Sequence, residues 1–162
     1  MESLFAYGTL RPGSHNHDLL ERVARQEQTA HAEGLALYDG PGFPYAAPAR
    51  DSRITGTLSS IADEDWPAAL RALDALEGYD PILERASHYI RRRWPVLTAS
   101  GAQTEAWIYL AGPRVDLDIY DQIHGGDWLR RATPTSPTRS HIGRRTHHVR
   151  TLRNGSAPSL PR

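Results

Sequence analysis

One carboxylate, Glu77, lies on the apolar stripe of a predicted helix. In "DWPAALRALDALEGYDP" successive helical residues turn by about 100°, which groups the apolar side chains into a narrow stripe. Glu77 falls in the middle of that stripe, whereas Asp74 points well off it. The apolar members of the stripe are Trp66, Leu70 and Leu73. The sequence therefore predicts that Glu77 projects toward the core from the last turn of the helix.

This position disfavours the charged form of Glu77. Burial raises the pKa of a carboxyl group, and the negative end of the helix dipole acts in the same direction. A carboxyl group with a raised pKa can serve as a general base or acid near neutral pH. The alternative is structural: Glu77 extends past the helix end or pairs with an arginine such as Arg11 or Arg85, since ion-pair networks also perturb carboxylates.

The other reactive side chains form weaker patterns. His15 and His17 stand near a predicted helix start, and further histidines are scattered without carboxylates at metal-ligand spacing, namely His31, His88 and His124. We therefore predict no metal site. The chain has no cysteine, which excludes disulfides and thiolate chemistry, and it has no serine in a nucleophile elbow.

The composition is that of one globular domain. The chain has 162 residues, enough for a hydrophobic core. No apolar run approaches the roughly eighteen residues of a membrane span. The N-terminus lacks the basic and apolar segments of a signal peptide. These features predict a cytoplasmic protein that does not bind a membrane.

The formal net charge of zero conceals two different parts of the chain. Residues 1–128 hold all 19 acidic residues and 11 arginines, a net charge of −8, whereas residues 129–162 hold eight arginines and no acid. The second part lacks a periodic apolar pattern, so we predict a disordered basic Arg/Pro/Ser/Thr tail over 129–162. A basic arm could contact nucleic acid, but the tail lacks interleaved aromatic residues and the acidic body repels phosphate.

Residues 1–128 carry the signals of several strands. The predicted strands are 4–6, 34–38, 54–61, 88–96 and 104–110. The last two are expected to form a hairpin with a long loop. Segment 39–49 contains three prolines and two glycines, so it is predicted as a structured loop or edge segment. Gly56 marks a bulge or a close backbone approach.

Two helices are predicted among these strands. The first is capped by Ser14 or Asn16 and presents apolar residues from Leu19 to Ala24. The second begins near Asp65 and ends at Gly78, which suits a left-handed C-terminal position. Elements of both types, dominated by non-local strands, predict an α+β or barrel-like domain.

Two motifs resemble those of the gamma-glutamylcyclotransferase family. They are "YGTLRPG" at 7–13, directly after the first strand, and "LDALEGYDP" at 73–81. The resemblance is closest to the branch of small avirulence-induced-protein-like and gamma-glutamylamine cyclotransferase proteins. It extends over 1–128 through a "YxR" strand and the segments "NHDLL", "GFPYAAPA", "EAWIY" and "GDW".

This resemblance implies a small mixed β-barrel with flanking α-helices, whose cavity opens at the Tyr-Gly-Thr-Leu loop. In the family the backbone of this loop holds a gamma-glutamyl group, so the resemblance implies substrate contacts for Tyr7, Gly8, Thr9 and Leu10. Gly8 would let the substrate approach the main chain closely. Backbone N–H groups at such a turn suit a carboxylate or an oxyanion, whereas a phosphate loop would need a following Gly-Lys-Ser or Gly-Lys-Thr.

Glu77 matches the catalytic glutamate of the family. The implied reaction releases 5-oxoproline and a free amine from a gamma-glutamyl amine or peptide, with no metal or organic cofactor. Tyr45 and Tyr109 are further candidates for substrate contacts, although a barrel tyrosine with a local partner also explains each. A non-catalytic protein that binds small molecules in the same cavity remains the alternative function.

Overall fold

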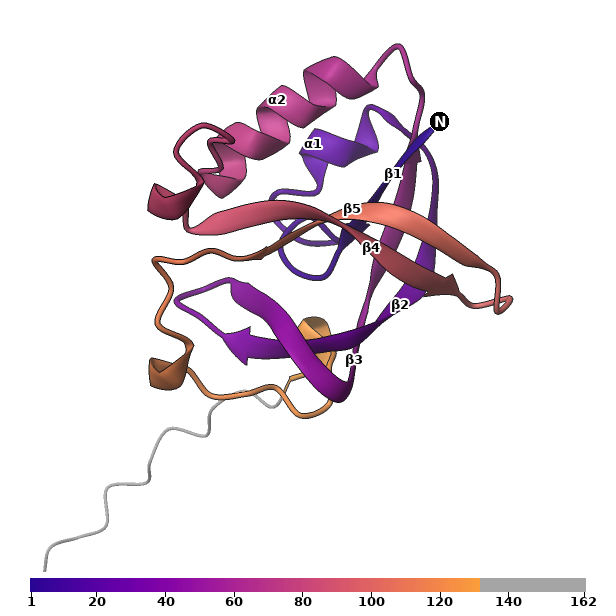
Figure 1. Cartoon of the computed structure of the whole chain (residues 1–162). Helices are drawn as coiled ribbons and strands as arrows, with labels where there is room; N and C mark the ends of the chain where they lie inside the picture. The colour runs from indigo at the N-terminus through magenta and orange to yellow at the C-terminus, as the bar shows by residue number, and fades with distance from the viewer. Residues whose placement is uncertain (132–162) are drawn as a thin grey trace, which may run out of the picture. The chain divides into compact units, whose positions relative to one another are not determined.

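The strand signals of the sequence correspond to five strands that close into a barrel. The computed structural model describes residues 1–131, and its strands follow one another around the barrel in the order β1-β3-β2-β4-β5 (Figure 1). The strands are β1 (Glu2–Ala6), β2 (Ala24–Asp39), β3 (Pro44–Ile61), β4 (Tyr89–Thr98) and β5 (Gln103–Ala111). Neighbouring strands are antiparallel, except that β1 and β5 close the barrel in parallel. The predicted α+β barrel with flanking helices is confirmed.

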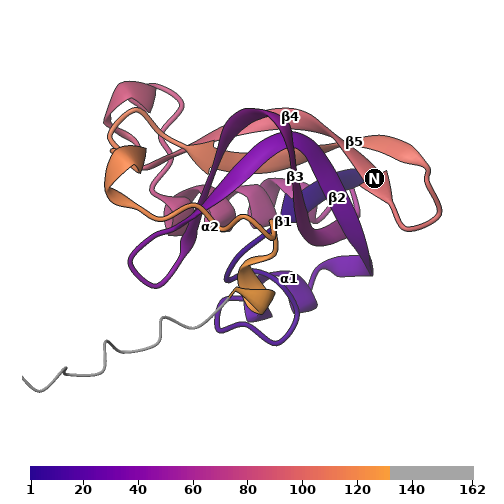
Figure 2. The ribbon, with the colours of Figure 1, turned by 90° about the horizontal axis from the view of Figure 1, so that it is seen from below.

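The two α-helices lie together on one side of the barrel. α1 (Asp18–Glu21) and α2 (Trp66–Glu77) are neighbours above the strands in Figure 1. Figure 2 looks at the opposite side, where the long hairpin of β2 and β3 is in front. Short 3₁₀ helices are formed by Glu84–Ala86, Leu117–Ile119 and Trp128–Arg130.

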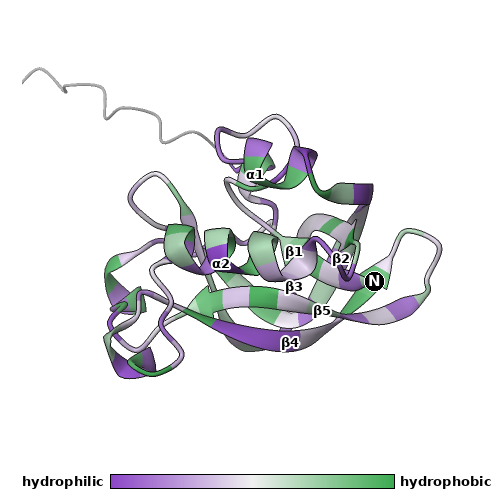
Figure 3. Cartoon of the chain, turned by 90° about the horizontal axis from the view of Figure 1, so that it is seen from above, coloured by the Kyte–Doolittle hydropathy of each residue, from purple (hydrophilic) through white to green (hydrophobic). Residues whose placement is uncertain are grey.

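The core has two layers because side chains alternate along β1. Phe5 points into the barrel interior with residues such as Leu37 and Ile108. Its neighbour Leu4 points the other way, toward Leu20 of α1 and Leu73 of α2. Successive strand residues face opposite sides, so β1 serves both layers. In Figure 3, α2 carries both hydrophobic and hydrophilic residues, as expected for a helix with one face on a barrel.

Two predicted strands are longer in the structure than in the prediction. The strand predicted at 34–38 begins at Ala24, and the strand predicted at 54–61 begins at Pro44. Segment 44–49 is therefore a strand, and it pairs with β2. Within the described residues no second strand pairs with it, which makes it an edge and explains how its prolines are tolerated. The expected close approach at Gly56 is confirmed, since a Cβ there would lie 2.6 Å from the Phe5 ring.

The first helix is shorter than predicted, and its cap is different. α1 makes a single turn, because the chain enters β2 at Ala24. The N-cap residue is His17, not Ser14 or Asn16, and the Asn16 side chain instead donates a hydrogen bond to Thr9 Oγ1 at 3.0 Å. The predicted limits of α2 are confirmed: Asp65 is its N-cap and Gly78 its left-handed C-cap.

The described chain continues past the predicted domain end at 128. Trp128 is buried, and Arg131 both stacks on it at 4.2 Å and pairs with Asp39 at 3.1 Å. The rest of the predicted basic tail, from residue 132 on, lies outside the described residues. Among the helices of residues 1–131, none has the length and apolar character needed to span a membrane.

Candidate functional site

A cavity of about 480 Å³ opens between the end of α2, the loop after β1 and the β2–β3 turn. Glu77 lines it, together with all six residues predicted to contact substrate: Tyr7, Gly8, Thr9, Leu10, Tyr45 and Tyr109. These residues come from four separate segments of the chain, so only the closed barrel brings them together. The cavity is therefore the candidate active site.

Of the carboxylates in the described part of the chain, Glu77 alone lines this cavity. Burial raises the pKa of its carboxyl group from 4.5 to about 7, and its place in the last turn of α2 adds the unfavourable helix dipole. Within residues 1–131 its side chain has no hydrogen-bond or ion-pair partner. The arginine pairing considered from sequence is therefore wrong for Arg11, which pairs with Asp127 at 2.6 Å. An unpaired, desolvated carboxyl group is suited to proton transfer near neutral pH.

In the loop from Tyr7 to Leu10, backbone carbonyls accept hydrogen bonds that fix the loop, while three backbone N–H groups stay free within residues 1–131. The N–H of Arg11 binds the carbonyl of Gly8, and the N–H of Asn16 binds the carbonyl of Thr9, both at 3.1 Å. Among the described residues, nothing accepts a hydrogen bond from the backbone N–H groups of Gly8, Thr9 and Leu10. Free N–H groups beside a cavity can bind a carboxylate or a developing oxyanion.

Gly8 packs against Pro44 across the cavity wall. A Cβ at Gly8 would lie 2.7 Å from Pro44 Cγ, closer than any ordinary contact. The sequence suggested that glycine here lets a ligand approach the backbone. The structure adds a second reason: the space that a side chain would need is already filled by Pro44 at the start of β3.

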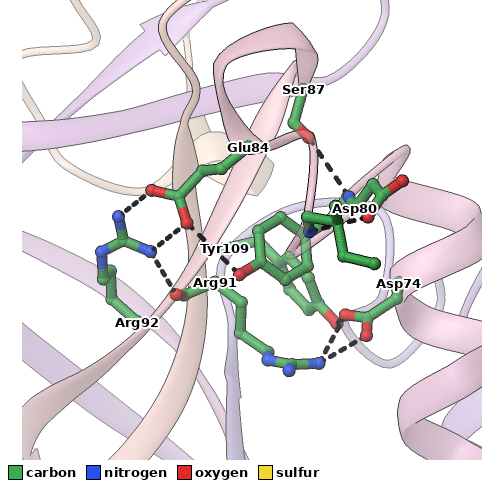
Figure 4. Close-up of polar contacts among 9 residues, drawn as sticks. Asp74, Asp80, Glu84, Ser87, Arg91, Arg92 and Tyr109 are labelled. Atoms are coloured by element: carbon green, nitrogen blue, oxygen red, sulfur yellow. Dashed lines mark hydrogen bonds and ion pairs between the residues drawn. The ribbon is translucent and has the colours of Figure 1, made fainter.

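A polar cluster fixes the C-terminal half of α2 on the barrel (Figure 4). Asp74 accepts hydrogen bonds from the Tyr109 hydroxyl of β5 at 2.6 Å and from the Arg91 guanidinium of β4 at 2.5 Å. The Arg91 guanidinium also lies over the rings of Tyr79 and Trp107, at 5.2 and 5.1 Å. The orientation of α2, and with it that of the cavity carboxylate, therefore depends on side chains from two strands.

The sequence analysis missed two features of this cluster. Asp74 was expected to point away from the buried stripe, and it does. On that side of the helix, however, it contacts Arg91 of β4 and Tyr109 of β5. Arg91 was interpreted only as part of a strand motif. Charged residues of opposite sign in a helix and in a following strand were the available signal, but a sequence does not reveal which strand packs beside the helix.

Tyr89, the tyrosine of the YxR strand motif, also lines the cavity. Its hydroxyl donates a hydrogen bond of 2.8 Å to the Pro44 carbonyl, and its ring lies 5.2 Å from that of Tyr45. The Tyr7 hydroxyl is likewise used within the protein, since it donates to the Tyr109 carbonyl. Burial raises the pKa of both Tyr7 and Tyr89, so both hydroxyls stay protonated.

The histidines of residues 1–131 do not assemble into a metal centre. His15 and His88 line the cavity from different segments, and His17 instead contacts Glu27 at 2.9 Å. Within residues 1–131 no three side chains of metal-ligating type cluster together.

Comparison with known proteins identifies the family. The family model described as gamma-glutamyl cyclotransferase, AIG2-like, matches residues 4–130. The chain belongs to this family. A Methanocaldococcus jannaschii protein that carries a provisional gamma-glutamylcyclotransferase name is 28% identical over 110 residues, which span 67% of this chain and 83% of that protein. The gamma-L-glutamyl-butirosin B gamma-glutamyl cyclotransferase of Niallia circulans is 26% identical over 128 residues, 79% of this chain and 76% of the relative.

Solved structures share the gamma-glutamyl cyclotransferase fold. YkqA from Bacillus subtilis superposes with a TM-score of 0.57 at 25% identity over 78% of this chain, but the match spans only 39% of YkqA. PH0828 from Pyrococcus horikoshii gives a TM-score of 0.54 at 21% identity, over 78% of this chain and 89% of its own.

Proposed function

We propose that this protein is a gamma-glutamyl cyclotransferase that acts on a small gamma-glutamyl amine or peptide. The alpha-amino nitrogen of the substrate attacks its own gamma-carbonyl carbon, and this new C–N bond closes a five-membered ring. The bond between the gamma-carbon and the amine nitrogen then breaks. The products are 5-oxoproline and the free amine.

Glu77 moves the protons that this reaction requires. An ammonium group cannot attack, so the Glu77 carboxylate first accepts a proton from the alpha-ammonium. The ring nitrogen loses a second proton as the lactam N–H forms. The departing amine takes up two protons when it leaves as an ammonium ion, so Glu77 ends the cycle as a carboxylate. A group with a pKa of about 7 can accept and return protons at neutral pH.

The rest of the site folds the substrate and stabilises charge. Both reacting groups belong to one molecule, so the protein needs only to hold the bent conformation in which they meet. The free N–H groups of Gly8, Thr9 and Leu10 are donors for the alpha-carboxylate or for the oxyanion of the tetrahedral intermediate. These steps use no metal or organic cofactor.

The observation that carries this proposal is the unpaired, desolvated Glu77 carboxyl in the same cavity as these donors. A structural glutamate in the same place would be expected to have an arginine partner, because an unpaired buried charge is costly. The names of the two family relatives support a gamma-glutamyl substrate. The relative from Niallia circulans is named as a cyclotransferase of gamma-L-glutamyl-butirosin B.

A turnover assay tests the proposal. The purified chain is expected to release 5-oxoproline, measured by chromatography, from at least one member of a panel of gamma-glutamyl amines and peptides. Glu77→Gln is expected to lower turnover by roughly 10²–10⁴-fold, as for loss of a general acid–base. Glu64→Gln is the matched control, because Glu64 lies beside the other end of α2 with 76% of its side chain exposed.

Two outcomes would contradict the proposal. A folded protein that binds gamma-glutamyl compounds but releases no 5-oxoproline is a binding protein. A Glu77→Gln protein with full turnover would show that another group transfers the proton.

A further inference from the structure

Two large apolar side chains on separate elements stand at the mouth of the cavity, where the exposed lining residues also include His15, Pro41, Gly78 and His88. Phe43 of the β2–β3 turn and Leu76 of α2 both line the cavity. They keep 36% and 40% of their surface exposed, respectively. Because burying apolar surface is favourable by about 25 cal/mol per Å², a ligand that covers both side chains gains affinity from its own apolar groups.

Aromatic rings continue from this mouth into the cavity. The Phe43 ring meets the Tyr45 ring edge-on at 5.5 Å, and the Tyr45 ring lies 5.2 Å from that of Tyr89. All three residues line the cavity. A further ring placed at the mouth can join this series in the edge-on or offset geometry that aromatic pairs prefer.

The tyrosines of the cavity are less polar than their number suggests. Four tyrosines line it, and three use their hydroxyls within the protein, on the Tyr109 carbonyl, the Pro44 carbonyl and the Asp74 carboxylate. Among residues 1–131 no arginine lines the cavity, and Glu77 is the one carboxylate that does. The wall therefore offers rings rather than charges to whatever lies beside the glutamyl group.

We infer that the amine portion of the substrate is an apolar amine with an aromatic ring, which contacts Phe43 and Leu76 at the mouth. This inference rests on the proposed function. The glutamyl portion carries an ammonium and a carboxylate, which Glu77 and the loop N–H groups match. With the glutamyl portion held by Glu77 and the loop, the amine portion extends toward the open end of the cavity, where the two exposed apolar side chains lie. Burial of its ring distinguishes it from a polar amine.

Three synthetic compounds test the inference: gamma-L-glutamyl-phenethylamide, gamma-L-glutamyl-ethanolamide and Nε-gamma-L-glutamyl-lysine. The kcat/KM for 5-oxoproline release is expected to be at least about tenfold higher for the phenethylamide than for the other two, since burial of one ring suffices for that ratio. Equal or higher kcat/KM for the ethanolamide or the lysine compound would overturn the inference and leave the proposed function intact.

Absence of turnover with all three compounds, together with an otherwise inactive gamma-glutamyl panel, would overturn the proposed function instead. The inference is then decided by calorimetric binding of the same compounds to the same protein. The phenethylamide is expected to bind at least about tenfold more tightly than the ethanolamide, and equal dissociation constants would overturn the inference.

A pair of variants tests whether the side chains at the cavity mouth cause the preference for the phenethylamide over the ethanolamide. Leu76→Asn is expected to reduce the ratio of kcat/KM between phenethylamide and ethanolamide by about fivefold or more, because it removes apolar surface from the mouth. Ile82→Asn is the matched control, since Ile82 is 88% exposed and does not line the cavity. It is expected to leave that ratio unchanged. An unchanged ratio in Leu76→Asn would remove Leu76 from the amine subsite and overturn the inference as stated.

Discussion

The hydroxyl of Tyr109 donates a hydrogen bond of 2.6 Å to Oδ1 of Asp74, and this contact joins β5 to α2. Asp74 lies three residues before Glu77, so it occupies the adjacent turn of the same helix. Arg91 holds the same Asp74 carboxylate from β4 at 2.5 Å. Glu77 itself has no such partner within residues 1–131, and the helix that carries it is oriented by its neighbour. This arrangement fixes the carboxylate in the cavity while leaving it free to react.

Asp74→Asn tests this positioning. The substitution removes the charge that attracts Arg91 and weakens the acceptor for Tyr109, so α2 is expected to shift. We expect kcat to fall roughly 10- to 100-fold, because small misplacements of a catalytic group are costly, with KM changed less than threefold as an order-of-magnitude expectation. Steady-state kinetics over the gamma-glutamyl panel measures both constants.

Asp65→Asn is the control for that experiment. Asp65 pairs with Arg25 at 2.9 Å at the opposite end of α2, where the arginine side chain is 58% exposed. An exposed pair contributes about 0.2–1 kcal/mol, so this variant should retain its kcat. A proportional loss of kcat in both variants would mean that general destabilisation, and not the position of Glu77, explains the effect.

The raised pKa of Glu77 predicts how stability depends on pH. Burial moves this pKa from 4.5 to about 7, so between those values the folded state binds more protons than the unfolded state. The free energy of unfolding therefore falls as pH rises through this window and is constant above it. In Glu77→Gln this fall in the free energy of unfolding should be absent. Above pH 7 the variant should therefore be more stable than the wild type by on the order of 3 kcal/mol.

Urea unfolding at about pH 5 and pH 8 measures this effect. Glu84→Gln provides a control of opposite sign, because hydrogen bonding to Arg92 lowers the pKa of the half-buried Glu84. Its carboxylate contributes stability above the unfolded pKa, so this variant should not gain stability at pH 8. A Glu77→Gln protein that is less stable than the wild type at pH 8 would reveal a favourable partner for the Glu77 carboxylate.

The same pKa predicts the pH dependence of turnover. The free enzyme accepts a proton only when Glu77 is ionised, so kcat/KM should rise with pH to a midpoint near 7. The residual kcat/KM of Glu77→Gln should not show this rise with pH. A wild-type profile that is flat between about pH 5.5 and 8 would exclude Glu77 as the base that limits the rate.

The helix α2 could be predicted closely because its signals are local. Pro67 stands near its start, Gly78 adopts φ 61° at its end, and the apolar period runs between them. The same periodicity placed Glu77 toward the interior. Its raised pKa and its place in the cavity then follow from burial alone, so the central feature of the site was accessible from the sequence.

The first half of β2 could not be predicted in the same way. Its inward-facing residues include Ala30 and Ala32, which are fully buried but carry little apolar signal. Their strand character comes from pairing with β3, which is a tertiary feature: nine of the fourteen β2–β3 residue pairs precede Leu35. For the same reason the sequence did not reveal that Asp74 meets Arg91, because this contact exists only after β4 packs beside α2.

Gly8→Ala tests the contact between the loop and the β2–β3 turn. The added Cβ would lie 2.7 Å from Pro44 Cγ, and overpacking of this kind costs about 1–3 kcal/mol. We expect lower stability and lower turnover, since the free N–H groups would move with the loop. In Gly8→Ala/Pro44→Ala, stability should recover in part, and a double-mutant cycle measures the coupling.

Gly125→Ala controls for loss of glycine flexibility, because no atom lies within 4 Å of its added Cβ. It should leave both stability and turnover near wild type. Additive effects of the Gly8 and Pro44 substitutions would show that the clash is not the cause.

Two truncations test where the folded body ends. Trp128 is 6% exposed within the barrel core, and Asp127 forms the 2.6 Å ion pair with Arg11 next to the Tyr7–Leu10 loop. Deletion of 132–162 removes a segment without a periodic apolar pattern and should leave the melting temperature and turnover unchanged.

Deletion of 128–162 removes Trp128, and loss of a large buried aromatic side chain costs about 3–5 kcal/mol. Differential scanning calorimetry should therefore separate the two proteins by many degrees. Turnover should fall with the second deletion, because Trp128 belongs to the same core cluster as Tyr7 and Asp127 would become the chain end. A melting temperature lowered by several degrees in the first deletion would show that residues beyond 131 also stabilise the fold.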